Sequence, residues 1–187
     1  MTVIYSDFGD VDTSVLKNIW GDLDAKIIRL KGAPITKDYD VNKTVDKAIA
    51  AEEDTLIVVG HGSDRGCWSP SGEYTISPFN LDLVKAKKFI GIWCHASDFA
   101  RRYHAKGFFS GMFISNASEA IYTLPYSKNQ VYSNKQITES EIKFCNILND
   151  FLKKDTPLKD WKYIIEGYTD NTFEVEKYNY SHVEYFG

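Results

Sequence analysis

No run of apolar residues in this 187-residue sequence approaches the roughly 18 that a membrane-spanning helix needs. The first residues, Met1-Thr2-Val3-Ile4-Tyr5, lack the basic segment of a secretory signal peptide and are typical of a strand. The chain has only three cysteines, Cys67, Cys94 and Cys145, in dissimilar contexts, which argues against a disulfide framework. We therefore predict a cytoplasmic protein that does not associate with membranes.

An excess of basic charge is also absent. The formal net charge is −4, so nothing in the composition favours a nucleic acid or an anionic surface as partner. A hydrophobic fraction of 43% with 14% aromatic residues indicates a globular chain and excludes a disordered one. The length suits one domain with a sizeable core, and no internal repeat or linker divides it, so we predict a single domain over residues 1–187.

Two short apolar runs, Thr55–Gly60 and Phe89–Trp93, form the centre of the sequence. Each is too short for a helix and rich in β-branched or aromatic residues, which indicates a buried strand. His61 follows the first run and Cys94 follows the second. Because the ends of neighbouring parallel strands share one edge of a sheet, we expect these two side chains to lie close together. A cysteine nucleophile needs such an imidazole to manage its protons.

The remaining pattern predicts an α/β fold. Strands at Val3–Ser6 and Ala25–Leu30, and helices near Asp12 and at Asn42–Ala51, give a β-α-β-α-β order that calls for a parallel sheet. We therefore predict a three-layer sandwich with a mostly parallel central sheet. The later elements expected are a hairpin within Arg65–Ser77, a short helix at Asn80–Lys87, a helix at Ala96–His104, a strand at Met112–Ser115, a helical turn at Ala117–Ile121, a strand at Tyr163–Glu166 and an aromatic tail at Tyr178–Phe186.

Two stretches are predicted to be loops, Gly32–Tyr39 and Leu124–Ile137. The second is rich in polar residues and is expected to be mobile beside the site. Thr138-Glu139-Ser140-Glu141 has the spacing of a capping box, which predicts that a long helix begins there.

Cys94 lies two residues before the expected helix Ala96–His104. A helix N-terminus lowers the pKa of a thiol, so this placement suits a nucleophile. Gly62 allows a close approach of the backbone, and its N–H could face an oxyanion. The competing interpretation is structural, with Cys94 an apolar residue at a strand end and His61 a hydrogen-bonded turn residue.

The succession of an apolar strand, His-Gly, a spacer, a second apolar strand and Cys resembles the signature of the caspase–gingipain–clostripain clan of cysteine peptidases. The residues that carry it are Leu56-Ile57-Val58-Val59-Gly60-His61-Gly62 and Phe89-Ile90-Gly91-Ile92-Trp93-Cys94. The β-α-β-α-β order before His61 and the hairpin after His-Gly look similar as well, so the resemblance covers about Val3 to Ser115. It implies a caspase/hemoglobinase-like fold and a cysteine endopeptidase that acts on peptide or protein substrates without a cofactor.

On this resemblance, Cys94 would attack the scissile carbonyl and His61 would protonate the leaving amine. The backbone amides of Gly62 and Cys94 would hold the oxyanion. Many members carry a small residue before the cysteine, whereas this chain has Trp93 there and His95 after it. An altered pocket, or a non-catalytic relative that serves as a binding module, therefore stays open.

The resemblance also implies a place for the substrate. The P1 side chain would enter beside the strand ends, which makes Ser115 and Asn116 candidate walls of its pocket. Glu119 could then attract a basic P1 residue. The alternative is that Ser115 and Asn116 only cap the following turn.

A second, looser resemblance is to enzymes that act on S-adenosylmethionine with water or halide. It rests on Ser6-Asp7-Phe8-Gly9 through Ala25-Lys26-Ile27-Ile28, and on Gly62-Ser63-Asp64-Arg65 and Pro78-Phe79-Asn80. Gly60 stands where their catalytic aspartate falls, and their later His-Gly-Arg-Asp pattern is absent. A nucleoside or S-adenosylmethionine-type hydrolase is therefore the third hypothesis.

No metal site is predicted. Cys94, His95, Asp98 and His104 carry groups that can bind metals. However, Asp98 lies only four residues after Cys94, and His104 falls on a later turn of the expected helix.

Overall fold

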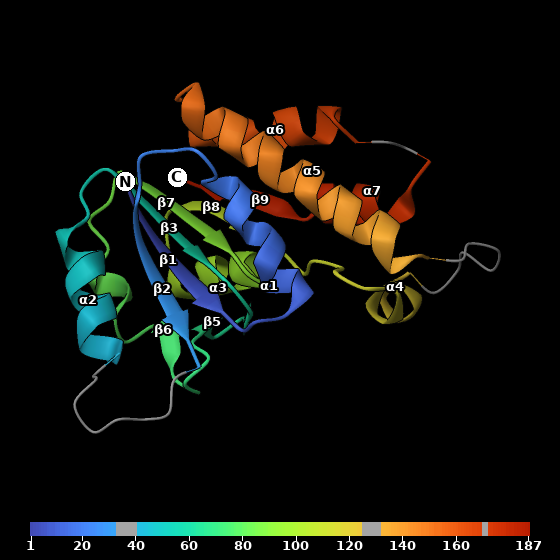
Figure 1. Cartoon of the computed structure of the whole chain (residues 1–187). Coiled ribbons are helices and arrows are strands. Elements are labelled where there is room, and N and C mark those ends of the chain that lie inside the picture. Colours follow the sequence, from blue (N-terminus) through green and yellow to red (C-terminus); the bar gives the residue numbers. More distant parts are fainter. Residues whose placement is uncertain (33–40, 125–131, 170–171) are drawn as a thin grey trace.

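The computed structural model describes residues 1–32, 41–124, 132–169 and 172–187. Its centre is a six-stranded sheet in the order β2-β1-β3-β7-β8-β9 (Figure 1). The strands are β1 (Thr2–Asp7), β2 (Lys26–Lys31), β3 (Thr55–Val59), β7 (Lys88–Ile92), β8 (Gly107–Ser110) and β9 (Val183–Phe186). The first five run parallel, and β9 is antiparallel to β8. The α/β fold with a mostly parallel sheet is thus confirmed.

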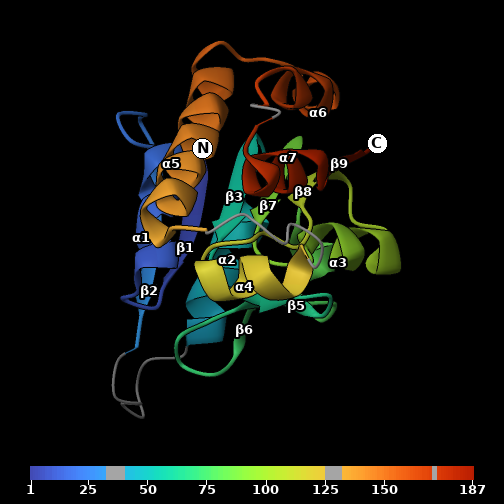
Figure 2. The same cartoon turned by 90° about the vertical axis from the view of Figure 1, so that its right-hand side faces the viewer.

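Helices cover both faces of the sheet (Figures 1 and 2). Along β3, Leu56 and Val58 belong to the core on the side of α2 and α3, while Ile57 and Val59 belong to the core beneath α5 and α6. Successive residues of a strand point to opposite faces, so a strand buried on both faces is apolar throughout. The helices are α1 (Val11–Val15), α2 (Val41–Ala51), α3 (Ala96–Tyr103), α4 (Ala117–Thr123), α5 (Asn134–Lys153), α6 (Leu158–Gly167) and α7 (Glu174–Ser181), with 3-10 turns η1 (Leu16–Ile19) and η2 (Leu81–Leu83). Within the described residues, no helix combines the length and apolarity needed to cross a membrane.

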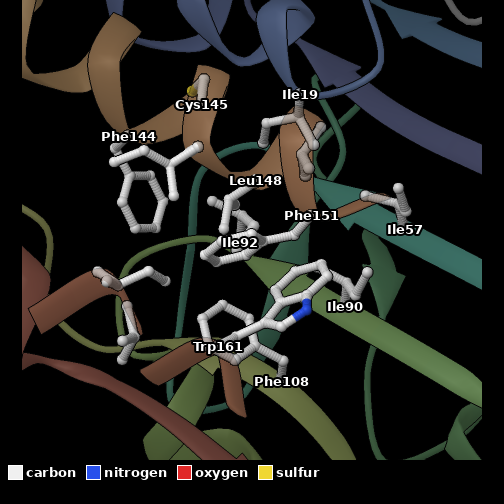
Figure 3. Close-up of a cluster of buried hydrophobic side chains, with 14 of the residues drawn as sticks. Ile19, Ile57, Ile90, Ile92, Phe108, Phe144, Cys145, Leu148, Phe151 and Trp161 are labelled. Atoms are coloured by element: carbon white, nitrogen blue, oxygen red, sulfur yellow. The ribbon is translucent and has the colours of Figure 1, made fainter. Parts of the chain in front are cut away.

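Aromatic contacts hold α5 and α6 on the sheet (Figure 3). The ring of Trp161 on α6 lies 5.0 Å from that of Phe108 on β8 and 5.3 Å from that of Phe151 on α5, measured between centroids. Edge-on and tilted pairs at such distances add to the gain from burying the rings. The packing of α6 therefore depends on residues far apart in the sequence.

The strand predicted at Tyr163–Glu166 is wrong, because this segment lies within α6. Leu158, Trp161 and Ile165 are buried and recur every three or four residues, which is the period of a helix. The short apolar run that begins at Tyr163 was mistaken for a strand, although Tyr163 itself is 83% exposed.

The strand predicted at Met112–Ser115 is also wrong, since β8 occupies Gly107–Ser110 instead. Phe108 pairs with Ile90 of β7 in the parallel register. A Cβ atom on Gly107 would lie 2.1 Å from the carbonyl oxygen of Phe89. The missing side chain of Gly107 therefore allows β8 to approach β7.

Helix α5 begins at Asn134, one turn before the expected start, and Ser133 caps it by accepting a hydrogen bond from the N–H of Gln136. The capping box at residues 138–141 is therefore wrong, and the predicted loop Leu124–Ile137 runs into a helix. Its residues 125–131, and residues 33–40 of the loop predicted at Gly32–Tyr39, lie outside the described residues.

The other late elements were predicted in part. The hairpin is confirmed as part of a small antiparallel sheet of β4 (Gly62–Ser63), β5 (Gly66–Trp68) and β6 (Tyr74–Ile76). The helix predicted at Asn80–Lys87 is reduced to η2. The aromatic tail forms the end of α7 and the whole of β9.

We expect Gly91→Ala to destabilise the fold. A Cβ atom at Gly91 on β7 would lie 2.6 Å from Cδ1 of Phe109 and 2.6 Å from Cζ3 of Trp93. Overpacking of this kind costs about 1–3 kcal/mol, measurable by urea unfolding. Gly167→Ala is the matched control and should cost little, because apart from its chain neighbours and its own helix backbone no described atom would lie within 4 Å of the added Cβ. Equal stability of the two variants would contradict this account of the packing.

Candidate active site

The predicted residues meet at the carboxyl-end edge of the parallel strands, near α1 and α4 (Figure 1). His61 follows β3 and Cys94 follows β7, and these strands are paired from Thr55–Lys88 to Val59–Ile92. His61 and Cys94 line the same cavity, which has a volume of about 50 Å³. The expectation that the two strand ends share one site therefore agrees with the structure. The other residues around the cavity are Asp12, Thr13, Val15, Leu16, Gly60, Ile92, Trp93, Ser110, Phe113, Ser115, Glu141, Phe144 and Cys145.

His61 is held by an aspartate that the sequence did not single out as functional. Its Nε2 atom lies 2.8 Å from Oδ2 of Asp10, and its ring makes an edge contact with Phe8, with centroids 4.9 Å apart. The other carboxylate oxygen of Asp10 accepts hydrogen bonds from the N–H and the hydroxyl of Thr13, and so caps α1. With Nε2–H donating to Asp10, Nδ1 of His61 is left as the acceptor.

Burial opposes the ionisation of Asp10, but the hydrogen bonds from Thr13 and His61 outweigh it and hold the pKa of this carboxyl below its usual value. Asp10 is thus an anion beside the imidazole at neutral pH. It can fix the orientation of the ring and stabilise its protonated form.

Cys94 carries a thiol whose resting form is protonated. Burial, followed by the carboxyl groups of Glu119, Asp12 and Glu141, raises the pKa of Cys94. The thiol donates a hydrogen bond to the carbonyl oxygen of Phe113 at 3.8 Å. The expectation that a helix start lowers this pKa is not met. The N-cap of α3 is His95, in a left-handed conformation with φ 66°, so the thiol precedes the cap.

Trp93 lies in the core, with 2% of its surface exposed. A Cβ atom on Gly62 would come within 2.2 Å of its Cδ1 atom, and its Nε1–H donates to the carbonyl oxygen of Ser63 at 3.1 Å. The ring also meets Phe99 edge-on, with centroids 5.6 Å apart. The bulk of Trp93 is therefore accommodated by the missing side chain of Gly62, which belongs to β4, and the oxyanion role of the Gly62 and Cys94 amides stays a prediction.

The predicted substrate-binding residues form a hydrogen-bonded group. The N–H and Oγ of Ser115 lie 2.8 and 3.0 Å from Oε2 of Glu119, and Oγ lies 2.9 Å from Oδ2 of Asp12. Asn116 caps α4 by accepting from the N–H of Glu119. Of the three, Ser115 lines the cavity, and Asn116 has the capping role that was its alternative interpretation.

Asp12 and Glu119 share a single hydroxyl. Because Ser115 has one hydroxyl hydrogen, it can donate to only one of the two carboxyls, and the other can bond to Oγ only if it carries a proton and donates it to Oγ. Burial raises the pKa of Asp12 despite the hydrogen bond from Ser115, and the charges of Asp10 and Glu119 add to the rise. Asp12 therefore favours retention of its proton.

Glu141 lines the cavity, although nothing in the sequence had marked it as a functional residue. Its side chain is 4% exposed, and its Oε2 atom has no hydrogen-bond partner among the described residues. Burial, and then Asp12 and Glu119, raise its pKa to about 9. Its position four residues after the buried Ile137 and four before the buried Cys145 was the available signal, since it places a carboxyl on the apolar face of α5.

Among the described residues, no group of three or more His, Cys, Asp or Glu side chains is arranged to hold a metal ion. Of the side chains weighed as ligands in the sequence, His95 Nδ1 pairs with Asp98 Oδ2 at 2.9 Å, and Arg101 also binds Asp98.

Comparison with known proteins found no relative of this chain. No protein-family model, no curated protein and no solved structure matches the chain. The chemistry of the site therefore has to be deduced from its own residues.

Glu141→Gln should change how stability depends on pH. A carboxyl whose pKa is raised by folding stabilises the native state fully below about 4.5, and this contribution is lost as the pH rises toward about 9. The loss is up to ~1.4 kcal/mol per pH unit in this range. Glutamine does not titrate, so unfolding curves should show the variant gaining stability relative to the wild type between pH 5 and pH 8.

Glu139→Gln, at a position on the same helix that is 63% exposed on its side chain, is the control and should show no such trend. A difference between Glu141→Gln and wild type that stays constant with pH would contradict the assigned protonation state.

Proposed function

We propose that this chain is a cysteine-type peptidase of caspase-like fold, with Cys94 as nucleophile and His61 as general acid and base. The observation that carries the proposal is that these two side chains, from paired parallel strands, line one cavity. Further support comes from the small antiparallel sheet β4-β5-β6, which follows His61 at the place where the clan resemblance implies a hairpin. Nucleophile, base and an orienting third group are the parts that such catalysis requires.

The reaction begins with the neutral thiol. Nδ1 of His61 accepts the proton as the sulfur of Cys94 attacks the carbonyl carbon, and the amides of Gly62 and Cys94 hold the oxyanion. His61 then gives that proton to the leaving nitrogen, the C–N bond breaks, and a thioester remains. A water molecule, deprotonated by His61, attacks the thioester, and the sulfur leaves and regains its proton from the imidazole.

Asp10 has a positioning role in this scheme. It accepts from Nε2–H of His61 and leaves Nδ1 free to exchange protons. The anionic carboxylate also stabilises the imidazolium that forms during attack. Its second role as the cap of α1 fixes the carboxylate relative to the sheet edge.

The raised pKa of the thiol fits a mechanism in which base and nucleophile act together, and it also fits a non-catalytic binding module with an inert cysteine. The two functions differ in whether peptide bonds are hydrolysed, so kinetics separate them.

We expect iodoacetamide to modify Cys94 before Cys67 and Cys145, which are 0% and 1% exposed. Because the pKa of Cys94 is raised, its alkylation at pH 7 should be slower than that of a free cysteine and should increase up to tenfold per pH unit toward alkaline pH. Peptide mapping by mass spectrometry gives the site and rate. Fastest modification of Cys145 in the folded protein would contradict the assignment.

Peptide-library hydrolysis tests the function itself. Cys94→Ser should abolish cleavage, and His61→Ala should lower kcat by about 10²–10⁴-fold, the usual contribution of general acid–base catalysis. Asp10→Asn should lower kcat at least tenfold with a smaller change in KM, because asparagine caps a helix as well as aspartate does but is not an anion.

Asp98→Asn, beside His95, is the matched control for Asp10→Asn and should leave kcat unchanged. Wild-type protein that cleaves no peptide, although Cys94 is alkylated, would support the binding module instead.

A further inference from the structure

The cavity contains an unpaired polar atom. Oε2 of Glu141 is buried without a hydrogen-bond partner among the described residues, on a side chain that is only 4% exposed and that lines the cavity. Leaving a buried oxygen without a partner costs about 1–3 kcal/mol. An atom in this state is a natural contact point for a group that binds in the cavity.

The groups that face Glu141 come from each element around the cavity. They are Asp12 from α1, His61 after β3, Cys94 after β7, Ser115 before α4, with Glu119 of α4 behind it, and Cys145 on α5 itself. None of the described residues around the cavity is a lysine or an arginine. Among those described residues, His61 is the one basic side chain, and it is bonded to Asp10. The cavity is therefore rich in carboxyls and lacks an internal cation to pair with them.

The walls of the cavity are apolar and its volume is small. Val15, Leu16, Ile92, Phe113 and Phe144 supply the apolar surface. A single water molecule needs about 10–15 Å³ on such a measure, so the volume of about 50 Å³ has room for a few non-hydrogen atoms. Apolar walls with a few converging polar groups are typical of a small-molecule site. The end of an alkylammonium chain has this size and polarity.

We propose that Glu141 is the recognition group of a subsite that binds a primary alkylammonium group, the end of a basic side chain, in this cavity. That the ammonium belongs to a peptide substrate rests on the proposed function, whereas the binding itself does not.

Binding in this subsite is coupled to a proton. The neutral carboxyl of Glu141 releases its proton to solvent, and the resulting carboxylate accepts an N–H bond from the ammonium group. Charge is conserved, because the cation that enters replaces the proton that leaves. Ser115 Oγ and the carboxyl of Asp12 are the neighbouring groups able to accept further N–H bonds.

The linkage gives a quantitative expectation. Since the pKa of Glu141 is about 9, binding near pH 7 should release close to one proton. Affinity should then increase up to tenfold per pH unit between pH 6 and pH 8. Burial also raises the pKa of Asp12, and this carboxyl would limit the increase if it releases its proton before Glu141 does.

The test uses ethylammonium chloride as ligand and ethanol as a neutral ligand of similar size, at constant ionic strength set with sodium chloride. Calorimetry in two buffers of different ionisation enthalpy gives the affinity and the number of protons released. For a ligand with three non-hydrogen atoms we expect a dissociation constant on the order of 1 mM. Glu141→Gln, which keeps the shape of the protonated side chain, should bind at least tenfold more weakly and release no proton, while Glu139→Gln should match the wild type.

Three outcomes would overturn the proposal: no binding of ethylammonium up to 100 mM, equal affinity of wild type and Glu141→Gln, or equal affinity for ethanol. Repeating the titration with Cys94→Ser separates the two proposals. Amine binding by both the wild type and Cys94→Ser, with no peptide cleavage by the wild type, would uphold the subsite alone. Peptide cleavage without amine binding would uphold the proposed function and reject the subsite.

Discussion

The parallel pairing of β3 with β7 is the constraint on which the site depends. The register runs from Thr55–Lys88 to Val59–Ile92, and the N–H of Gly60 extends it by donating to the carbonyl oxygen of Ile92 at 3.2 Å. Both strands leave the sheet at the same level, so His61 and Cys94 border one cavity. The pairing in turn needs Gly91 of β7 and Gly62 of β4, because Trp93 fills the space that their side chains would take.

Three different arrangements stabilise the carboxyl groups at this edge. Asp10 is paired with His61 and with the N-terminus of α1, so its pKa falls. Asp12 and Glu119 share the hydroxyl of Ser115. In the part of the chain that the structure describes, Oε2 of Glu141 has no such partner, and burial keeps its proton in place. Each arrangement avoids an unpaired buried charge, which is among the most costly features a folded chain can have.

The sequence predicted the strands that are buried on both faces, because a short continuous apolar run such as Thr55–Val59 is typical of a central parallel strand. The predictions from sequence were wrong where one local pattern is compatible with two different secondary structures. The run at residues 163–165 suggested a strand, yet the burial of Trp161 and Ile165 against the sheet selects a helix. A strand was expected at Met112–Ser115, yet β8 lies at Gly107–Ser110, where the glycine allows a close approach to β7. In both cases tertiary contacts outweighed local propensity.

By itself, then, the sequence determined the α/β class, the central parallel strands and the placement of a histidine and a cysteine at neighbouring strand ends, because these follow from periodicity and strand order. Only the tertiary structure decided the chemical state of those groups. The partner of His61, the raised pKa of Cys94 and the protonated Glu141 all arise from residues that lie far apart in the chain. Electrostatic energies depend on distance and burial in three dimensions, and a linear sequence specifies neither directly.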